Sequence, residues 1–177
     1  MNKCVFFDKD GTLNSVIRRH NKITGPWNMS EFSPFSDVKD SLSILKNEGY
    51  YLLIVSNQPD YYDGYLRLND LNAMDQWYRA HGIDDSFYAF DRYSKYYKPM
   101  NGMIEFFIQK YHIDRTKSYI VGDSWKDMAA GRDSSLHTIQ IGITAQEEND
   151  MLKYKPNYQC NYLTEVINYI LKTKERK

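Results

Sequence analysis

The sequence has no surplus of charge of either sign. Its 177 residues carry 23 lysines and arginines against 23 aspartates and glutamates, so the formal net charge is zero. A general nucleic-acid binder needs a surplus of cations that displaces counterions from the phosphates. The charge balance therefore argues against nucleic acid as a partner, although it is compatible with a small local basic patch.

Cysteines are scarce and long hydrophobic runs are absent. The two cysteines, Cys4 and Cys160, lie near opposite ends and offer neither a disulfide framework nor the spacing of metal ligands. No run approaches the roughly 20 apolar residues of a membrane span, and the apolar stretch at 4–7 is too short for a signal peptide. We therefore expect a cytoplasmic protein that does not enter a membrane.

The composition is that of a folded protein with an unusual number of tyrosines. Hydrophobic residues make up 42% of the chain and charged residues 26%, and the length predicts a single domain over residues 1–177. Aromatic residues reach 15%, and 16 of them are tyrosines. Because tyrosine joins an apolar ring to a hydroxyl group, this surplus suits a core, a ligand rim or a partner surface, and composition does not choose among them.

Segments typical of strands alternate with segments typical of helices. Short apolar runs predict strands at 4–7, 50–55, 87–90, 119–121 and 138–141. Helical spacing or capping residues predict helices that begin near Val38 and Asn69 and others over 102–111, 125–133 and 163–171. The stretch 14–35 contains Gly25, Pro26 and Pro34 and is expected to be irregular. This alternation predicts an α/β fold whose parallel sheet has helices on both faces.

Polar side chains follow the predicted strands at the points where the apolar runs end. Since ligands of open α/β sheets bind beyond the carboxyl ends of the strands, we expect these side chains to share one small volume. Several carboxylates in one place repel one another unless a cation lies among them, and oxygen ligands suit Mg²⁺. A hydroxyl and an ammonium group then fit as contacts to phosphate oxygens. The residues concerned are Asp8, Asp10, Ser56, Lys98, Asp123 and Asp127.

The spacing of the first two acids suggests a division of roles. Asp8 can attack phosphorus as a nucleophile and form an aspartyl-phosphate. Asp10 can protonate the leaving oxygen and then activate the water that hydrolyses the intermediate. Gly11 permits a sharp turn directly after them. The pattern therefore predicts phosphoryl transfer, in which electrostatic stabilisation of the phosphate oxygens supplies most of the catalysis.

At this point the residues resemble a known group of enzymes. The run 8–14, followed in order by Ser56, Lys98 and the pair Asp123 and Asp127, resembles the four motifs of the haloacid dehalogenase superfamily of phosphohydrolases. The segments 55–59, 98–103, 121–127 and 130–132 are most similar to the branch of heptose 1,7-bisphosphate phosphatases and histidinol-phosphate phosphatases. The resemblance covers about residues 3–171 and implies a Rossmann-like sheet with a minimal cap domain or none.

The resemblance also implies roles for individual residues. Asp8 would be the nucleophile and Asp10 the general acid and base, while Asp127 would orient Lys98 or a metal-bound water. The expected Mg²⁺ ligands are Asp8, Asp123 and the main-chain carbonyl of Asp10, and the expected phosphate contacts are Thr12, Ser56, Asn57 and Lys98. The substrate would be a small phosphorylated metabolite, most plausibly a sugar phosphate such as a heptose (bis)phosphate. The enzyme would be a monomer or a small homo-oligomer.

The sequence departs from this branch in the loops that surround the motifs. Many relatives carry a zinc-binding loop of cysteines and histidines before the motif lysine, but 91–97 contains neither residue, so we predict no structural zinc. The substrate-gripping arginine of the relatives is Tyr97 here, and an Arg-Gly pair is Asp63 followed by glycine. Candidates that could replace the lost substrate contacts are Arg18, Arg19, Arg92 and Tyr97.

Three alternatives to a sugar phosphatase follow from the same residues. The substrate could be histidinol phosphate or a polynucleotide 3′-phosphate, although the zero net charge disfavours the polynucleotide. The chain could also be a phospho-accepting or purely binding relative without turnover. We further expect the tyrosines of two loops to line the rim of the pocket, namely Tyr61, Tyr62, Tyr65, Tyr93, Tyr96 and Tyr97.

Overall fold

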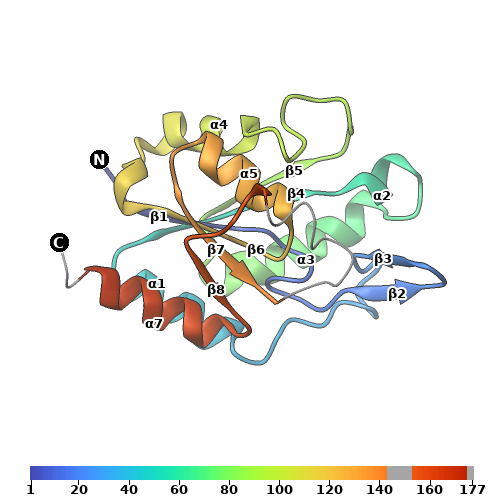
Figure 1. Ribbon diagram of the computed structural model, residues 1–177. Coiled ribbons are helices and arrows are strands. Elements are labelled where there is room, and N and C mark those ends of the chain that lie inside the picture. Colours follow the sequence, from blue (N-terminus) through green and yellow to red (C-terminus); the bar gives the residue numbers. More distant parts are fainter. Residues whose placement is uncertain (143–152, 175–177) are drawn as a thin grey trace.

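A six-stranded parallel sheet forms the centre of the molecule, as the alternating pattern predicts. The computed structural model describes residues 1–142 and 153–174 (Figure 1). The strands lie in the order β5-β4-β1-β6-β7-β8, and every neighbouring pair is parallel. Their bounds are Cys4–Phe7 (β1), Tyr51–Asn57 (β4), Asp85–Ala89 (β5), Tyr119–Gly122 (β6), His137–Ile141 (β7) and Tyr158–Cys160 (β8).

Helices cover both faces of this sheet. Figure 1 shows α4 and α5 above the sheet and α1 and α7 below it. The helices are Val38–Asn47 (α1), Pro59–Tyr62 (α2), Leu68–Ala80 (α3), Gly102–Tyr111 (α4), Trp125–Asp133 (α5) and Leu163–Lys174 (α7), with a 3₁₀ turn at Arg115–Lys117 (η1). The arrangement is the Rossmann-like α/β fold expected from the sequence.

The central strand β1 is buried along its whole length, which explains its uninterrupted apolar sequence. Val5 and Phe7 belong to the core beneath α1 and α7, while Cys4 and Phe6 belong to the core beneath α4. Successive side chains of a strand point to opposite faces of a sheet, so a strand covered on both sides has no polar face. The apolar run therefore continues until the strand leaves the sheet at Asp8.

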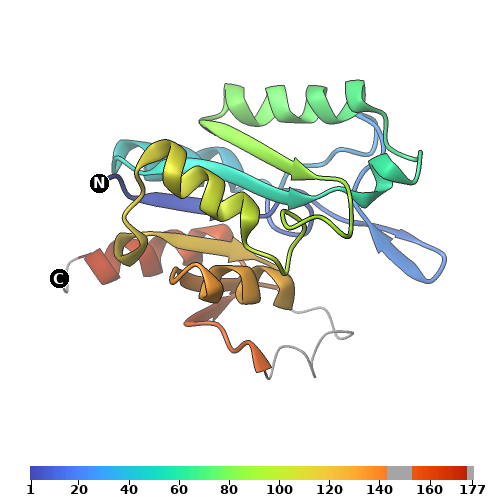
Figure 2. The ribbon, with the colours of Figure 1, turned by 90° about the horizontal axis from the view of Figure 1, so that it is seen from above.

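The strand order places the predicted motif residues next to one another. Strand β1 pairs with β4 on one side and β6 on the other, and Phe7 lies opposite both Ile54 and Val121. The segments that follow Phe7 and Val121, together with the end of β4, therefore emerge side by side at the carboxyl edge of the sheet. In Figure 2 the strands point toward the same edge, where α2 also lies.

The stretch 14–35 is not wholly irregular, which corrects the expectation from the sequence. It contains an antiparallel hairpin of two three-residue strands, Ile17–Arg19 (β2) and Lys22–Thr24 (β3). The turn places His20 in the left-handed region with φ = 50°, where glycine or asparagine is more usual. Three residues are too few to reveal an alternating pattern.

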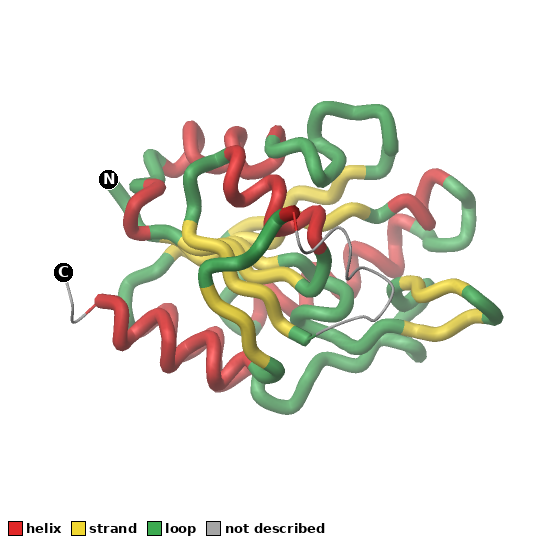
Figure 3. The backbone as a smooth tube through the Cα atoms, viewed as in Figure 1, coloured by secondary structure: helices red, strands yellow, loops and turns green. Residues whose placement is uncertain are grey.

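The hairpin extends from the carboxyl edge of the sheet, beside α2 (Figures 1 and 3). Strand β8 was also missed, because it has three residues and pairs with β7 alone. The short helix α2 and the 3₁₀ turn η1 were missed as well. The remaining differences lie at the ends of elements, and the most useful is that β4 includes Ser56 and Asn57. None of the helices in residues 1–142 and 153–174 has the length and apolar character to cross a membrane.

Candidate active site

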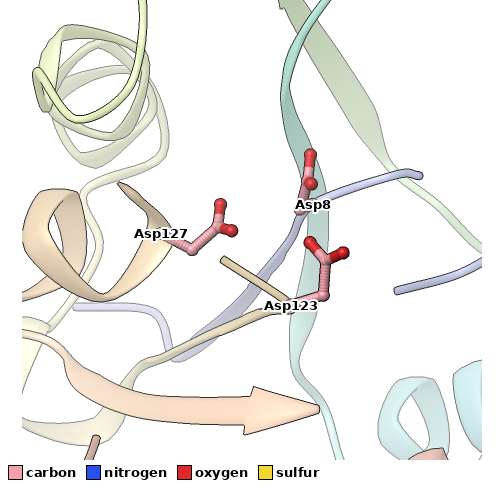
Figure 4. Close-up of side chains that lie close together, drawn as sticks. All are labelled: Asp8, Asp123 and Asp127. Carbon is pink, nitrogen blue, oxygen red and sulfur yellow. The ribbon is translucent and has the colours of Figure 1, made fainter. Parts of the chain in front are cut away.

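Three carboxylates gather beyond the carboxyl ends of β1 and β6. Asp8 follows β1 and is fixed by a main-chain hydrogen bond from its N–H to the carbonyl of Val121, 2.9 Å away. Asp123 follows β6, and Asp127 lies in the first turn of α5. One oxygen of each carboxylate lies within 4.8 Å of the others, and Figure 4 shows the three side chains around one small space.

Lys98 lies between two of these acids. Its Nζ donates a hydrogen bond to Oδ1 of Asp127 at 2.5 Å and lies 2.9 Å from Oδ1 of Asp8. Lys98 is 3% exposed and Asp127 1% exposed, so bulk water screens little of this interaction. Burial alone lowers the pKa of Lys98, but Asp127 and Asp8 outweigh burial and hold the pKa above its ordinary value. The ammonium group therefore stays charged.

The N-terminus of α5 holds Asp127 in place. Ser124 and Asp127 form a capping box, in which Ser124 Oγ accepts from the N–H of Lys126 and Asp127 Oδ2 accepts from the N–H of Ser124. Gly122 allows the close approach, since a Cβ at that position would overlap the Asp127 carboxylate. Burial raises the pKa of Asp127 above its ordinary value, and the Lys98 ammonium opposes this rise.

Asn57 positions Lys98 from the other side. Its side-chain Nδ2 donates to the carbonyl of Lys98 at 2.9 Å, and its Oδ1 accepts from the N–H of Lys98, also at 2.9 Å. The amide of Asn57 thus clamps the main chain of the loop that carries Lys98. The sequence patterns suggested a direct phosphate contact, whereas in this structure the side-chain amide bonds to the protein.

Three donors hold the carboxylate of Asp10. Lys9 Nζ and Asn14 Nδ2 donate to Oδ1 at 2.5 and 2.9 Å, and Gln58 Nε2 donates to Oδ2 at 2.8 Å. Asn14 is oriented in turn by the hydroxyl of Tyr78, which donates to its Oδ1 at 2.6 Å. The acid two residues after Asp8 therefore has a fixed orientation, as a proton-transferring group requires.

Two predicted phosphate contacts are buried hydroxyl groups. Ser56 is 1% exposed, and its Oγ accepts a hydrogen bond from Gln58 Nε2 at 3.2 Å. Thr12 is fully buried, and its hydroxyl has no hydrogen-bond partner within residues 1–142 and 153–174. A buried hydroxyl without a partner is uncommon, because its desolvation is not compensated.

A cavity of about 240 Å³ opens over the carboxylates and Lys98, and neither Ser56 nor Thr12 is among the residues that line it. It brings together seven of the residues singled out from the sequence and adds side chains from the hairpin, α2 and α5. The predicted residues on its wall are Asp8, Asp10, Asn57, Tyr97, Lys98, Asp123 and Asp127, and the additional ones include Thr24, Asp60 and Lys126. This volume is small for a ligand site, which suits a group of the size of a phosphoryl ester.

The three arginines predicted as substrate contacts do not line this cavity. Arg18 is exposed on β2 and lines neither this cavity nor the neighbouring cavity of about 500 Å³. Arg19 and Arg92 line the neighbouring cavity, and each is paired with a carboxylate, Arg19 with Glu31 and Arg92 with Asp63. Arg19 and Arg92 therefore already have partners within the chain, while Lys126 lines the first cavity and Lys22 lines its neighbour.

The tyrosine-rich loops are divided between the two cavities and the protein surface. Tyr97 lines the catalytic cavity and Tyr65 the neighbouring one. Tyr61 packs on Phe90, and Tyr93 is 97% exposed. The two remaining tyrosines line neither cavity, since Tyr62 is exposed and Tyr96 packs on Phe87.

Sequence patterns missed several residues of the site. Lys9 stands in a charged run that is typical of a surface, yet it is fully buried. Tyr78 lies on α3 and carries no motif, so only the tertiary structure reveals its contact with Asn14. Asn14 and Gln58 stood within the segments that resembled the superfamily, and those segments were the signal that could have identified them.

The donor set fits a hard divalent cation. Asp8 and Asp123 offer carboxylate oxygens, the ligands that Mg²⁺ prefers, and these oxygens lie within 4.8 Å of each other, close enough to share one ion, while Asp127 beside them is bound to Lys98. A Cβ on Gly11 would overlap the carboxylate of Asp123, so glycine at this position leaves room for that side chain. The residues present therefore fit Mg²⁺.

Comparison with known proteins gives the same family. The polynucleotide kinase 3 phosphatase family matches residues 3–164. A D-glycero-beta-D-manno-heptose-1,7-bisphosphate 7-phosphatase of Haemophilus influenzae is 31% identical over 146 residues, which are 74% of this chain and 76% of that protein. The enzyme of the same name from Haemophilus ducreyi is 27% identical over an alignment of 189 positions, which covers 95% of this chain and 98% of that enzyme.

A solved structure agrees in fold. The D,D-heptose 1.7-bisphosphate phosphatase from B. bronchiseptica, complexed with magnesium and phosphate, superposes with a TM-score of 0.81 at 20% identity, and the match covers 97% of this chain and 99% of that one. The resemblance stated from the motifs is thereby confirmed. The chain belongs to the polynucleotide kinase 3 phosphatase family and is a phosphatase of the haloacid dehalogenase type.

Proposed function

We propose that this protein is a Mg²⁺-dependent phosphomonoesterase that acts through an aspartyl-phosphate on a small phosphorylated sugar. The observation that carries the proposal is the placement of Asp8 beside Lys98, Asp123 and Asp127 in one cavity, with Asp10 on its wall. Two similar proteins are named as heptose-1,7-bisphosphate 7-phosphatases, and these names support a sugar as the substrate class.

In the first step, a carboxylate oxygen of Asp8 attacks phosphorus. The bond from this oxygen to phosphorus forms while the bond to the ester oxygen breaks, and Asp10 gives its proton to the departing oxygen. Lys98 lies 2.9 Å from Oδ1 of Asp8, so its ammonium is placed to compensate negative charge on the phosphoryl oxygens. Asp127 and Asn57 act on this step by fixing Lys98.

In the second step, Asp10 takes a proton from the water that attacks the aspartyl-phosphate. The bond between Asp8 and phosphorus breaks, inorganic phosphate forms, and both aspartates return to their first states. The three donors to Asp10 hold its carboxylate toward the cavity in both steps.

Mg²⁺ would be held by the carboxylates of Asp8 and Asp123 and the main-chain carbonyl of Asp10. When bound, it would neutralise negative charge on the phosphate and on the surrounding carboxylates. Ser56 accepts from Gln58, so its own hydroxyl hydrogen can donate to a phosphate oxygen, and the unpartnered hydroxyl of Thr12 suits the same role.

The test is hydrolysis of a panel of sugar phosphates in Mg²⁺ by the wild-type protein and by Asp8→Asn. We expect turnover of at least one ester and its loss in Asp8→Asn, with Asp40→Asn, an exposed acid of α1, as the matched control. Turnover that survives Asp8→Asn would overturn the covalent mechanism. Histidinol phosphate and a 3′-phosphorylated oligonucleotide in the same panel test the alternative substrates, and a long-lived phosphoprotein without turnover would indicate a non-catalytic relative.

A further inference from the structure

The catalytic cavity shares part of its wall with a larger neighbour, and Asp60 lies on the shared part. We propose that Asp60 determines substrate specificity by accepting a hydrogen bond from a hydroxyl group of the substrate. The enzyme would then take a polyhydroxylated monophosphate in preference to a bisphosphate. This inference rests on the proposed function and goes beyond it, since it distinguishes this chain from relatives named for a bisphosphate.

The path of the substrate follows from the residues that the cavities share. Ile23, Thr24, Pro59 and Asp60 line both the catalytic cavity and the cavity of about 500 Å³ beside it. An ester whose phosphoryl group lies against Asp8 therefore extends between the hairpin and α2. The carboxylate of Asp60 is the charged group on this shared wall.

The carboxylate of Asp60 is held in place and keeps capacity to accept. Its Oδ2 accepts from Nε1 of Trp27 at 2.9 Å, and a carboxylate offers about four acceptor positions. Trp27 is itself fixed on both faces of its ring. Tyr65 stacks on one face with ring centroids 4.6 Å apart, and the guanidinium of Arg19 lies 3.7 Å from the ring centroid. A rigid acceptor of this kind favours a hydroxyl group because it needs no reorganisation.

The two arginines of the neighbouring cavity are engaged by carboxylates. Arg92 donates two hydrogen bonds to Asp63, at 2.9 and 2.6 Å, and Arg19 is bound to Glu31. Hydrogen bonds from Arg92, together with the nearby charge of Lys22, lower the pKa of Asp63, so this acid remains ionised and in partnership with them. Both arginines of the cavity are thus already balanced by carboxylates, and the third cation, Lys22, places its charge near Asp63.

A second phosphate would meet an unfavourable environment here. To reach either arginine it would have to displace Glu31 or Asp63, and it would lie near the carboxylate of Asp60, whose charge has the same sign. Rejection of a competing ligand by like charge is a common source of specificity. Sugar hydroxyl groups carry no charge and can donate to Asp60.

The experiment compares matched ketose pairs in Mg²⁺, fructose 6-phosphate with fructose 1,6-bisphosphate and sedoheptulose 7-phosphate with sedoheptulose 1,7-bisphosphate. We expect the wild-type kcat/KM to favour the monophosphates by about tenfold or more. Asp60→Asn should lower kcat/KM for the monophosphates, chiefly through KM, and bring the ratio close to one. Asp60→Lys should reverse the preference, so that kcat/KM is higher for the bisphosphates. Asp40→Asn, the same change of charge on an exposed helix, is the control.

The ratio of kcat/KM for the monophosphate to kcat/KM for the bisphosphate distinguishes a role of Asp60 in specificity from a purely structural role. If Asp60 only anchored Trp27, its substitution would reduce activity on both members of a pair alike, and the inference would be wrong. A wild-type preference for the bisphosphates would also overturn it, whatever the variants do. If the protein hydrolyses both classes and Asp60→Asn has the same ratio of kcat/KM values as the wild type, this inference is wrong but the proposed function stands. A folded wild-type protein that hydrolyses no ester overturns the proposed function and this inference together.

Discussion

Lys98 and Asp127 form a buried ion pair in which Nζ lies 2.5 Å from Oδ1, and this contact joins the loop after β5 to the first turn of α5. The same ammonium approaches Asp8, so one cation serves two carboxylates. Under the proposed mechanism, catalysis and stability would therefore depend on the same atoms.

Replacing Lys98 by methionine should destabilise the fold. The substitution leaves Asp127 buried without its cation, and breaking a buried pair in this way costs about 3–5 kcal/mol. The free energy of unfolding in urea would measure the loss. Lys95→Met, an exposed lysine three residues earlier, should change it by less than about 0.5 kcal/mol. A Lys98→Met variant as stable as the control would show that the pair contributes nothing.

Adding Asp127→Asn to Lys98→Met should restore part of the lost stability. The second substitution removes the charge that the first leaves without a partner, so the two effects should not add. A double-mutant cycle in urea measures the coupling directly. Strict additivity would contradict the interaction described here.

Gly11→Ala should impair the protein more than Gly64→Ala does. Both glycines adopt the left-handed region, with φ of 82° and 81°, so alanine pays about 1 kcal/mol or more of backbone strain at either position. Only at Gly11 would the new Cβ overlap the carboxylate of Asp123, while Gly64 has open space around it. We expect kcat/KM to fall by more than about tenfold for Gly11→Ala alone. Equal effects of the two substitutions would argue against the tight fit of Asp123.

Asp10→Asn should separate the two chemical steps. An aryl ester such as p-nitrophenyl phosphate needs little protonation of its leaving oxygen, so Asp8 should still be phosphorylated, but hydrolysis of the aspartyl-phosphate loses its base. Stopped-flow measurements should show a burst of nitrophenol equal to the enzyme present, followed by turnover slowed roughly 10²–10⁴-fold. A steady rate without a burst would contradict the role assigned to Asp10.

Removal of the metal should abolish activity and lower thermal stability. Mg²⁺ that binds the folded state alone stabilises it by about 2.7 kcal/mol at a concentration 100 times its Kd. Titration of Mg²⁺ into protein treated with a chelator should therefore raise Tm. Asp123→Asn should lose this rise, because it removes one carboxylate of the group formed with Asp8 and Asp127. A Tm shift of the same size in the variant would place the ion elsewhere.

Stability should depend on pH through Asp85. Burial raises the pKa of this acid, but hydrogen bonds from Lys110, Arg79 and Tyr111 outweigh burial and hold the pKa well below its ordinary value of 3.8. Because the folded state lowers the pKa, the stabilisation is complete above that ordinary value and is lost as the pH falls through the folded-state pKa.

Asp85→Asn should therefore be less stable than the wild type at neutral pH, by about 1 kcal/mol after solvent screening. The difference should shrink below about pH 4. Urea unfolding of both proteins across this range measures it, and 1 M salt should reduce it further because the partners are partly exposed. A difference in the free energy of unfolding that grows as the pH falls would contradict the lowered pKa of Asp85.

Much of the fold could be predicted from the sequence, because local patterns of apolar and capping residues indicate the strands and helices. The apolar run of β1 stops abruptly at Asp8, and α4 and α5 have the bounds that their spacing and capping residues predict. The hairpin around His20 and the short β8 could not be read in this way, because three-residue strands depend on pairing rather than on their own pattern.

The amino-acid sequence alone was sufficient to predict a phosphatase and to predict that Asp8, Asp10 and Asp123 lie close together, since they stand at strand ends and parallel strands bring such ends together. The surroundings of those acids depended on tertiary contacts. Lys9 is buried against Asp10, and the arginines beside Asp60 are paired with carboxylates, because residues distant in the chain decide which charges remain available to a ligand.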